Sequence, residues 1–183
     1  MTSQPTKDLE GDVLRPGERG YDAARAVFNA MIDRKPLAIL RCHEASDVAR
    51  GIAYARRYEL PLSVRSGGHN VAGSAVCDDG IMLDLSVMRS IAVDGGNRTA
   101  QAAPGLLLGD LDRATQAHGL AVPLGVMSKT GIAGLTLGGG LGWLNARYGL
   151  ACDNLLGADL VTADGELVRV TEDDHADLLW GLR

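Results

Sequence analysis

The stretch that decides the fold is Leu62-Ser63-Val64-Arg65-Ser66-Gly67-Gly68-His69-Asn70, in which a short apolar strand pattern runs directly into a glycine turn. A second apolar run precedes it at residues 37–41, and residues 46–57 between the two carry apolar side chains at helical spacing. Strand, helix and strand in this order predict a βαβ unit, whose second strand should lie parallel to the first.

The rest of the chain predicts short strands and helices around this unit. Strands are expected at 80–85, 91–93 and 98–102, and helices at 21–32, 108–118 and near 172–182. In the helix at 21–32, Ala24, Val27, Phe28 and Met31 should share a buried face, whereas about the first twelve residues should be disordered or lightly docked. Strand patterns flank Asp164-Gly165, which favours a type I′ hairpin. We therefore expect an α+β fold, with a small parallel α/β subdomain packed on an antiparallel-sheet subdomain.

Composition excludes several classes of function. The chain has 183 residues, and its 46% hydrophobic and 22% charged content is ordinary for a soluble globular protein. The net charge is −5 and the 18 Lys and Arg are dispersed, so neither a nucleic-acid nor a membrane partner is expected. Three widely spaced cysteines form no C-x-x-C pair, and the N-terminus has no apolar core typical of a signal peptide. These features predict a cytoplasmic protein.

The glycine turn after residue 65 has the composition of an anion-binding loop. Successive backbone N–H groups of Ser66-Gly67-Gly68-His69-Asn70 can point into one concavity and bind a phosphate, and Ser66, Asn70 and Ser74 add side-chain donors. The loop lacks the Gly-Lys-Ser/Thr of a P-loop and the glycine spacing of a Rossmann fingerprint.

His69, at the apex of the loop, could have one of several roles. It could be an ordinary hydrogen-bonded loop histidine. It could also ligate a metal with Cys77, Asp78 and Asp79, although these three residues look like a turn before a strand and no His-x-x-x-His spacing supports a metal site.

A second glycine-rich stretch runs through residues 131–143. Each glycine costs a helix about 1 kcal/mol relative to alanine, so a free-standing helix is disfavoured here. Gly138 to Gly142 could suggest dinucleotide binding, but no clean strand precedes them, and tight packing of backbone against backbone is the alternative. Cys152 follows in Gly149-Leu150-Ala151-Cys152-Asp153-Asn154, and taken alone it would be a small buried apolar residue.

Together these segments resemble the FAD-linked oxidases of the berberine-bridge-enzyme-like group, which have the vanillyl-alcohol-oxidase or PCMH type of FAD-binding domain. The matching segments are 65–70, Asp84-Leu85-Ser86, 122–125, 134–143 and 149–154, in the order of the family. The resemblance implies that the first loop binds the FAD pyrophosphate, that His69 bonds to the flavin 8α-methyl carbon, and that Cys152 forms a thioether to flavin C6. The residues it places at the cofactor are Arg65, Ser66, Gly67, Gly68, His69, Asn70, Ser74, Asp84, Leu85, Ser86, Gly125, Gly131, Gly134, Gly138, Gly139, Leu141, Cys152, Asn154 and Val161.

The resemblance also implies a domain plan and an activity. Residues 1–35 are an N-terminal lead and helix, and 36–183 are the FAD-binding domain, truncated at its C-terminal end, with the substrate domain and its catalytic base absent. The expected activity is oxidation of an alcohol or C–H substrate, with electrons passed to dioxygen or another acceptor. One alternative is a non-catalytic remnant of the fold without flavin. Another is a UDP-sugar reductase with the same FAD domain, in which the flavin is not covalently held and His69 would have no purpose.

Overall fold

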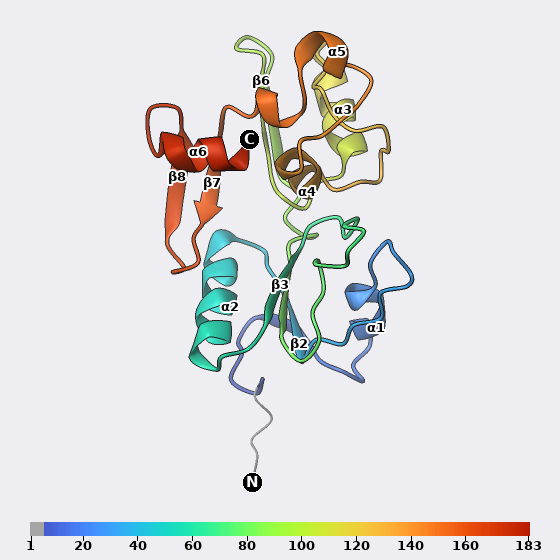
Figure 1. Cartoon of the computed structure of the whole chain (residues 1–183), viewed down its shortest axis with the longest axis vertical. Coiled ribbons are helices and arrows are strands. Elements are labelled where there is room, and N and C mark those ends of the chain that lie inside the picture. Colours follow the sequence, from blue (N-terminus) through green and yellow to red (C-terminus); the bar gives the residue numbers. More distant parts are fainter. Residues whose placement is uncertain (1–5) are drawn as a thin grey trace. The chain divides into compact units, whose positions relative to one another are not determined.

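The computed structural model describes residues 6–183 and divides them into two compact units (Figure 1). Unit 1 contains the residues up to Val87 together with Val161–Leu167, and unit 2 contains Met88–Leu160 and Val168–Arg183. Each unit has its own buried core, and each is described by itself.

Unit 1 is built on a four-stranded sheet with the order β1-β2-β4-β3. The strands are β1 (Asp12–Leu14), β2 (Ala38–Arg41), β3 (Leu62–Arg65) and β4 (Ile81–Asp84). Both β2 and β3 run parallel to β4, which lies between them, and helix α2 (Ala45–Arg57) connects β2 to β3. The predicted βαβ unit is therefore confirmed, with β4 inserted between its two strands. Strand β1, which the sequence did not predict, begins at residue 12 and pairs antiparallel with β2. Of the N-terminal segment expected to be disordered or lightly docked, residues 1–5 lie outside the described residues.

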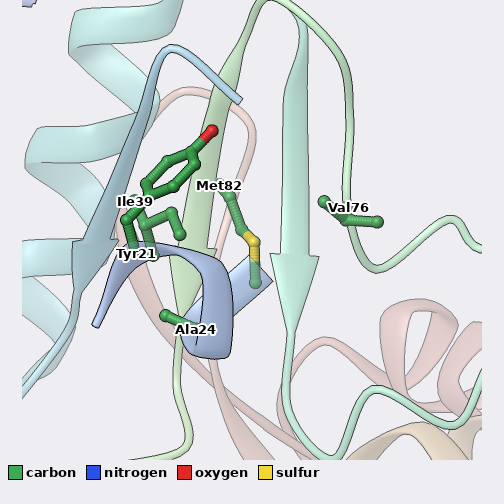
Figure 2. Close-up of a cluster of buried hydrophobic side chains, with 5 residues drawn as sticks. All are labelled: Tyr21, Ala24, Ile39, Val76 and Met82. Atoms are coloured by element: carbon green, nitrogen blue, oxygen red, sulfur yellow. The ribbon is translucent and has the colours of Figure 1, made fainter. Parts of the chain in front are cut away.

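The two faces of this sheet are covered by different parts of the chain. On one face Leu40 and Leu83 meet α2 at Gly51, where a Cβ would lie 2.3 Å from Leu83 Cδ2, so the missing side chain lets the helix lie close to the sheet. On the other face Ile39 and Met82 pack with residues of helix α1 and of the loop before β4. The members of this cluster, drawn in Figure 2, are Tyr21, Ala24, Ile39, Val76 and Met82.

Helix α1 is much shorter than the sequence predicts. It spans Tyr21–Arg25, and Ala26 already has extended backbone, with φ −65° and ψ 131°. Phe28 and Met31, expected on the buried face of a longer helix, are 68% and 90% exposed. The helix ends early because the chain beyond it bonds to the glycine loop instead, where the Phe28 N–H donates to the Gly68 carbonyl at 2.9 Å.

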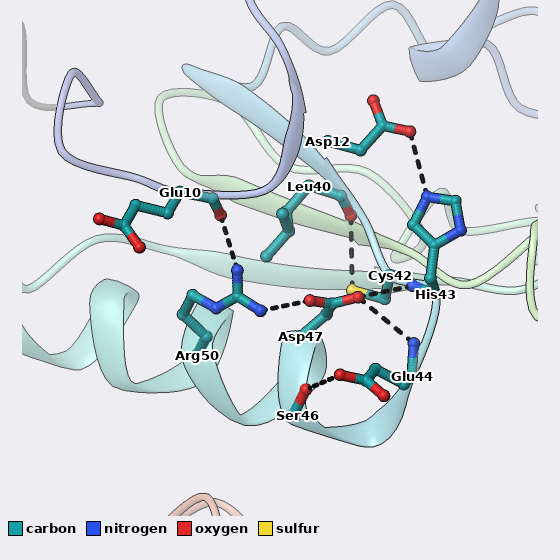
Figure 3. Close-up of polar contacts among 9 residues, drawn as sticks. All are labelled: Glu10, Asp12, Leu40, Cys42, His43, Glu44, Ser46, Asp47 and Arg50. Carbon is teal, nitrogen blue, oxygen red and sulfur yellow. Dashed lines mark hydrogen bonds and ion pairs between the residues drawn. The ribbon is translucent and has the colours of Figure 1, made fainter.

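Asp47 anchors the N-terminus of α2 (Figure 3). Its Oδ2 accepts hydrogen bonds from the backbone N–H groups of His43 at 2.8 Å and Glu44 at 3.3 Å, and its Oδ1 pairs with Arg50. Burial by itself raises the pKa of the Asp47 carboxyl, but the two amides and the Arg50 charge outweigh it and hold that pKa below its usual value.

Replacing Asp47 by alanine should destabilise unit 1 by about 2 kcal/mol, because two helix-terminal N–H groups lose their acceptor. A lowered carboxyl pKa contributes stability above about pH 4 that is lost as the pH falls through the folded-state value. The variant should therefore lose less stability than the parent when the pH falls below about 4. Urea unfolding at several pH values measures both effects, with Asp173→Ala at an exposed carboxylate as control. Equal acid sensitivity of parent and Asp47→Ala would contradict the assignment.

Unit 2 contains short helices and antiparallel strands. Strands β5 (Ile91–Asp94) and β6 (Thr99–Ala102) pair antiparallel, and β7 (Gly157–Val161) forms a two-stranded sheet with β8 (Leu167–Thr171). The helical elements are α3 (Leu108–Gln116), α4 (Ile132–Leu137), α5 (Asn145–Tyr148), the 3-10 turn Cys152–Asn154 and α6 (Ala176–Leu182). Leu108, Leu111, Leu124 and Ala151 form the centre of the core. The glycine-rich stretch thus contains one short helix, α4, that the sequence did not predict.

The turn at Asp164-Gly165 differs from the prediction. A type I′ turn requires positive φ at both residues, but among the described residues only Gly165 of this pair has one, at +83°. Thr162 N–H bonds to the Glu166 carbonyl, and Gly165 N–H bonds to the Thr162 carbonyl, so the connection is a three-residue loop with glycine in the left-handed position. The predicted hairpin is confirmed, whereas the prediction of a type I′ turn was wrong. The mixed α+β class is confirmed as well.

Within residues 6–183, no helix has both the length and the apolar character needed to cross a bilayer.

Candidate functional site

The segments 65–70 and 84–86 leave the sheet of unit 1 at the same edge. Strands β3 and β4 are parallel and in register from Leu62–Ile81 to Arg65–Asp84, so both chains leave at neighbouring carboxyl ends. The Leu85 N–H donates to the Arg65 carbonyl at 2.8 Å and continues the pairing one step further. The carboxyl edge of parallel strands is where open α/β sheets bind ligands.

Arg65 and Asp84 fix the base of the glycine loop. Asp84 is only 2% exposed; its Oδ2 lies 3.7 Å from Arg65 Nη1, and its Oδ1 accepts the Ser86 N–H at 3.0 Å. Arg65 Nη1 also donates to the Ala24 carbonyl at the end of α1 at 2.9 Å. Arg65 Nε is buried and has no hydrogen-bond partner within the described part of the chain. The contacts of Arg65 with Ala24 and Asp84 join α1, β3 and β4 beneath the loop.

The loop itself presents backbone donors. Within residues 6–183, no group accepts a hydrogen bond from the N–H groups of Gly67, Gly68 or His69. Gly68 has a positive φ of +69°, and a Cβ on it would lie 3.1 Å from Arg65 Nε, so only glycine suits this close turn. Three successive N–H groups without a protein acceptor, in a glycine turn, fit the binding of a phosphate-type anion.

Asn70 and Ser74 close the loop on its far side. Asn70 Oδ1 accepts the Ser74 N–H at 3.1 Å, and the Asn70 carbonyl accepts the Gly73 N–H at 3.1 Å. Gly73 has φ +75°, and a Cβ there would lie 2.8 Å from Ile32. The side-chain oxygen of Asn70 thus holds the turn, while its amide group remains a candidate donor.

The His69 imidazole is partly exposed and stacks on Phe28, with ring centroids 4.5 Å apart and planes 15° from parallel. This contact was not predicted, because the helical spacing of the sequence places Phe28 on the apolar face of a helix over residues 21–32. No local pattern could reveal it, since the two residues are 41 positions apart and meet only through the fold.

In unit 2 the two parts of the second predicted segment are joined by backbone hydrogen bonds. The carbonyls of Gly139 and Gly140 accept the N–H groups of Cys152 and Ala151, each at 3.0 Å. Gly139 and Gly140 have φ values of +100° and +80°, which favour glycine. Cys152 is 3% exposed, and its Sγ lies 3.9 Å from Asp153 Oδ1.

The other residues predicted at the cofactor either contact neighbouring residues of the fold or have open space around them. Gly125 lies close to Leu135, whereas a Cβ on Gly134 would meet no atom within 4 Å. Gly131 precedes the first residue of α4 and Gly138 follows its last, and the side chain of Leu141 is exposed. The Asn154 side chain donates to the carbonyls of Tyr148 and Leu150 and so holds its own loop. Val161, which belongs to unit 1, ends β7.

The remaining cysteine and histidine candidates are either buried or lie beside a single neighbouring residue. Cys42 is fully buried, and burial raises the pKa of its thiol to about 12. His43 Nε2 lies 3.3 Å from Asp12 Oδ2, and His175 Nδ1 lies 2.9 Å from Asp174 Oδ1. The ring of His118 packs near Gly95. Within residues 6–183, no cluster of three or more His, Cys, Asp or Glu side chains could hold a metal ion.

Comparison with known protein families identifies the family to which the chain belongs. The family described as FAD binding domain matches residues 36–171, which include both glycine segments. The chain belongs to the FAD binding domain family. This confirms the expected kinship with FAD-linked oxidoreductases and the PCMH-type fold.

Individual relatives agree with this assignment. The (R)-6-hydroxynicotine oxidase of Paenarthrobacter nicotinovorans is 42% identical over 175 residues, which are 96% of this chain and 38% of the relative. The crystal structure of 6-hydroxy-D-nicotine oxidase from Arthrobacter nicotinovorans superposes with a TM-score of 0.94 at 41% identity, over 97% of this chain and 40% of that one. A structure described for the 6-S-cysteinyl, 8α-N1-histidyl FAD of glucooligosaccharide oxidase from Acremonium strictum gives a TM-score of 0.89 at 31% identity, over 94% of this chain and 37% of that one. The FAD-binding chain thus spans about two fifths of the length of these relatives.

Proposed function

We propose that this chain is the FAD-binding part of a flavoprotein oxidase and holds its cofactor covalently through His69, with a second bond through Cys152. The observation that carries the proposal is the turn at Gly67, Gly68 and His69, whose N–H groups have no acceptor within residues 6–183. This turn fits a pyrophosphate and ends at the partly exposed His69. The glucooligosaccharide oxidase relative is described with a flavin bonded to both a histidine and a cysteine, which supports the same two residue types here.

The two proposed tethers stand in different surroundings. The His69 ring is partly exposed, so an imidazole nitrogen can approach a bound flavin. Cys152 is 3% exposed, and sulfur attack requires the thiolate. The His69 bond is therefore the better supported of the two, and the Cys152 bond needs a separate test.

On attachment, one C–H bond of the 8α-methyl group would break and a bond would form between that carbon and an imidazole nitrogen of His69. The two protons released, one from the methyl group and one from the imidazole N–H, and two electrons would be taken up by FAD. Dioxygen would then accept two protons and two electrons to give hydrogen peroxide, so the protein would gain the mass of FAD less two hydrogen atoms.

The proposed activity of the whole enzyme is oxidation of an alcohol or C–H substrate, with electrons passed to dioxygen or another acceptor. FAD, when bound, supplies the two-electron redox chemistry. The residues of this chain supply the phosphate-binding turn, the tethers and the rigid base formed by Arg65 and Asp84. We propose that a small-molecule substrate binds through a further domain. The match to the (R)-6-hydroxynicotine oxidase covers only 38% of that relative, which leaves a long segment for such a domain there.

Acid precipitation of the purified chain tests the proposal. Precipitated protein should stay yellow, and its mass should exceed the sequence mass by one FAD less two hydrogens. Colourless protein after precipitation would rule out covalent attachment. Protein that never binds flavin, even without acid, would favour the alternative of a non-catalytic module.

A further inference from the structure

We propose that Phe28 is a positioning residue that fixes the plane of the His69 imidazole for bond formation to the flavin. This inference rests on the proposed function, because it concerns the rate at which the His69 bond forms. Phe28 lies far from His69 in sequence and belongs to a segment that the sequence predicted to be helical.

The first support is the geometry of the two rings. They stack 4.5 Å apart and within 15° of parallel, a separation at which aromatic rings attract each other. A parallel stack covers one face of the imidazole. The lone pair that would bond to carbon lies in the plane of the ring and points outward from its edge, so the stack leaves the reactive direction open.

The second support is that the Phe28 segment is bonded to the loop on both sides of His69. The Phe28 N–H donates to the Gly68 carbonyl at 2.9 Å, and the Asn29 side-chain amide donates to the Val71 carbonyl at 2.8 Å. Both bonds and the stack lie within unit 1. The ring of Phe28 is therefore held against His69 by the backbone as well as by its own stacking.

The third support is exposure. Phe28 is the single phenylalanine of the chain, and the residue is 68% exposed, so burial in the core does not account for its position. The chain leaves helix α1 after Arg25, and this departure brings Phe28 over His69. The contact thus serves the histidine rather than the core.

A fixed ring plane should affect the rate of attachment more than the binding of flavin. Bond formation needs the nitrogen aimed at the 8α carbon, and small misplacements of a reacting group are costly in rate. Initial binding of FAD depends on the backbone donors at Gly67, Gly68 and His69, which Phe28 does not supply.

The test measures attachment in the Cys152→Ala background, where His69 is the remaining proposed tether. Flavin-free chain is mixed with FAD in aerated buffer, and acid-stable flavin is followed over time. Phe28→Ala and Phe28→Leu should attach flavin about tenfold more slowly, while the affinity for FAD before attachment changes less than about threefold. Phe28→Tyr and Phe28→Trp should restore the rate. Met31→Ala, at a more exposed residue of the same segment, is the control.

A second readout needs no flavin. The ring protons of His69 should show an upfield NMR shift from the Phe28 ring, and Phe28→Ala should remove it while the signals of His43, His118 and His175 stay in place. Attachment at the parental rate by Phe28→Ala, or absence of the upfield shift in the parent, would overturn the role of Phe28 alone. A Cys152→Ala parent that attaches no flavin would overturn both this inference and the His69 tether.

Discussion

The double variant His69→Ala, Cys152→Ala is expected to lose all of its flavin on acid precipitation, whereas the parent should lose none. The two changes remove both proposed nucleophiles, an imidazole nitrogen and a sulfur, and leave the proposed phosphate-binding turn in place. Flavin binding without covalent attachment should therefore persist, and flavin should co-elute with the double variant under native conditions. Absorbance of the protein before and after precipitation, with intact mass, measures the outcome.

The single variants separate the two tethers. If both bonds form, His69→Ala keeps flavin on the peptide that contains residue 152, and Cys152→Ala keeps it on the peptide that contains residue 69. Complete release of flavin from His69→Ala would show that Cys152 forms no bond to flavin. Cys152 is only 3% exposed, so this variant tests whether a buried thiol can form the second bond. Covalent flavin in the double variant would refute the site. His118→Ala with Cys77→Ala is a matched control that changes the same residue types elsewhere.

The second large effect is expected at Gly142. A Cβ built there would lie 1.7 Å from the carbonyl oxygen of Leu124 and 2.8 Å from its carbonyl carbon. Both atoms belong to the backbone, so no side-chain rotation can relieve the overlap. Gly142→Ala should therefore destabilise the flavin-free chain by about 3 kcal/mol or more, because the backbone around the buried Leu124 must shift. The urea midpoint for unfolding, followed by circular dichroism, measures this loss.

Gly134→Ala is the matched control in the same glycine stretch. Gly134 lies inside α4, and a Cβ on it would meet no atom within 4 Å. Alanine there should leave the stability unchanged or raise it by up to about 1 kcal/mol, since alanine favours a helix over glycine. Equal losses of stability for Gly134→Ala and Gly142→Ala would contradict the packing role assigned to Gly142.

The sequence by itself determined strands β2 to β6, helices α2 and α3 and the glycine turn that follows β3. Strands β2, β3 and β4 and helix α2 have strong apolar patterns, which act over a few residues and need no distant partner. The glycines of the loop could also be interpreted locally, because positive φ is a property of single residues. The order of the two glycine segments was enough to suggest the family, which the match over residues 36–171 confirms.

Only the tertiary structure decided where helix α1 ends, that β1 joins the sheet, and what Phe28 contacts. Helical periodicity continues to residue 32 in the sequence, but hydrogen bonds to the loop at residues 68–71 replace those of the helix after Arg25. Such contacts join residues about 40 positions apart, so no local pattern encodes them. The glycine turn after β3 was thus predictable from its own residues, while the stacking of Phe28 on His69 was visible only once the chain had folded.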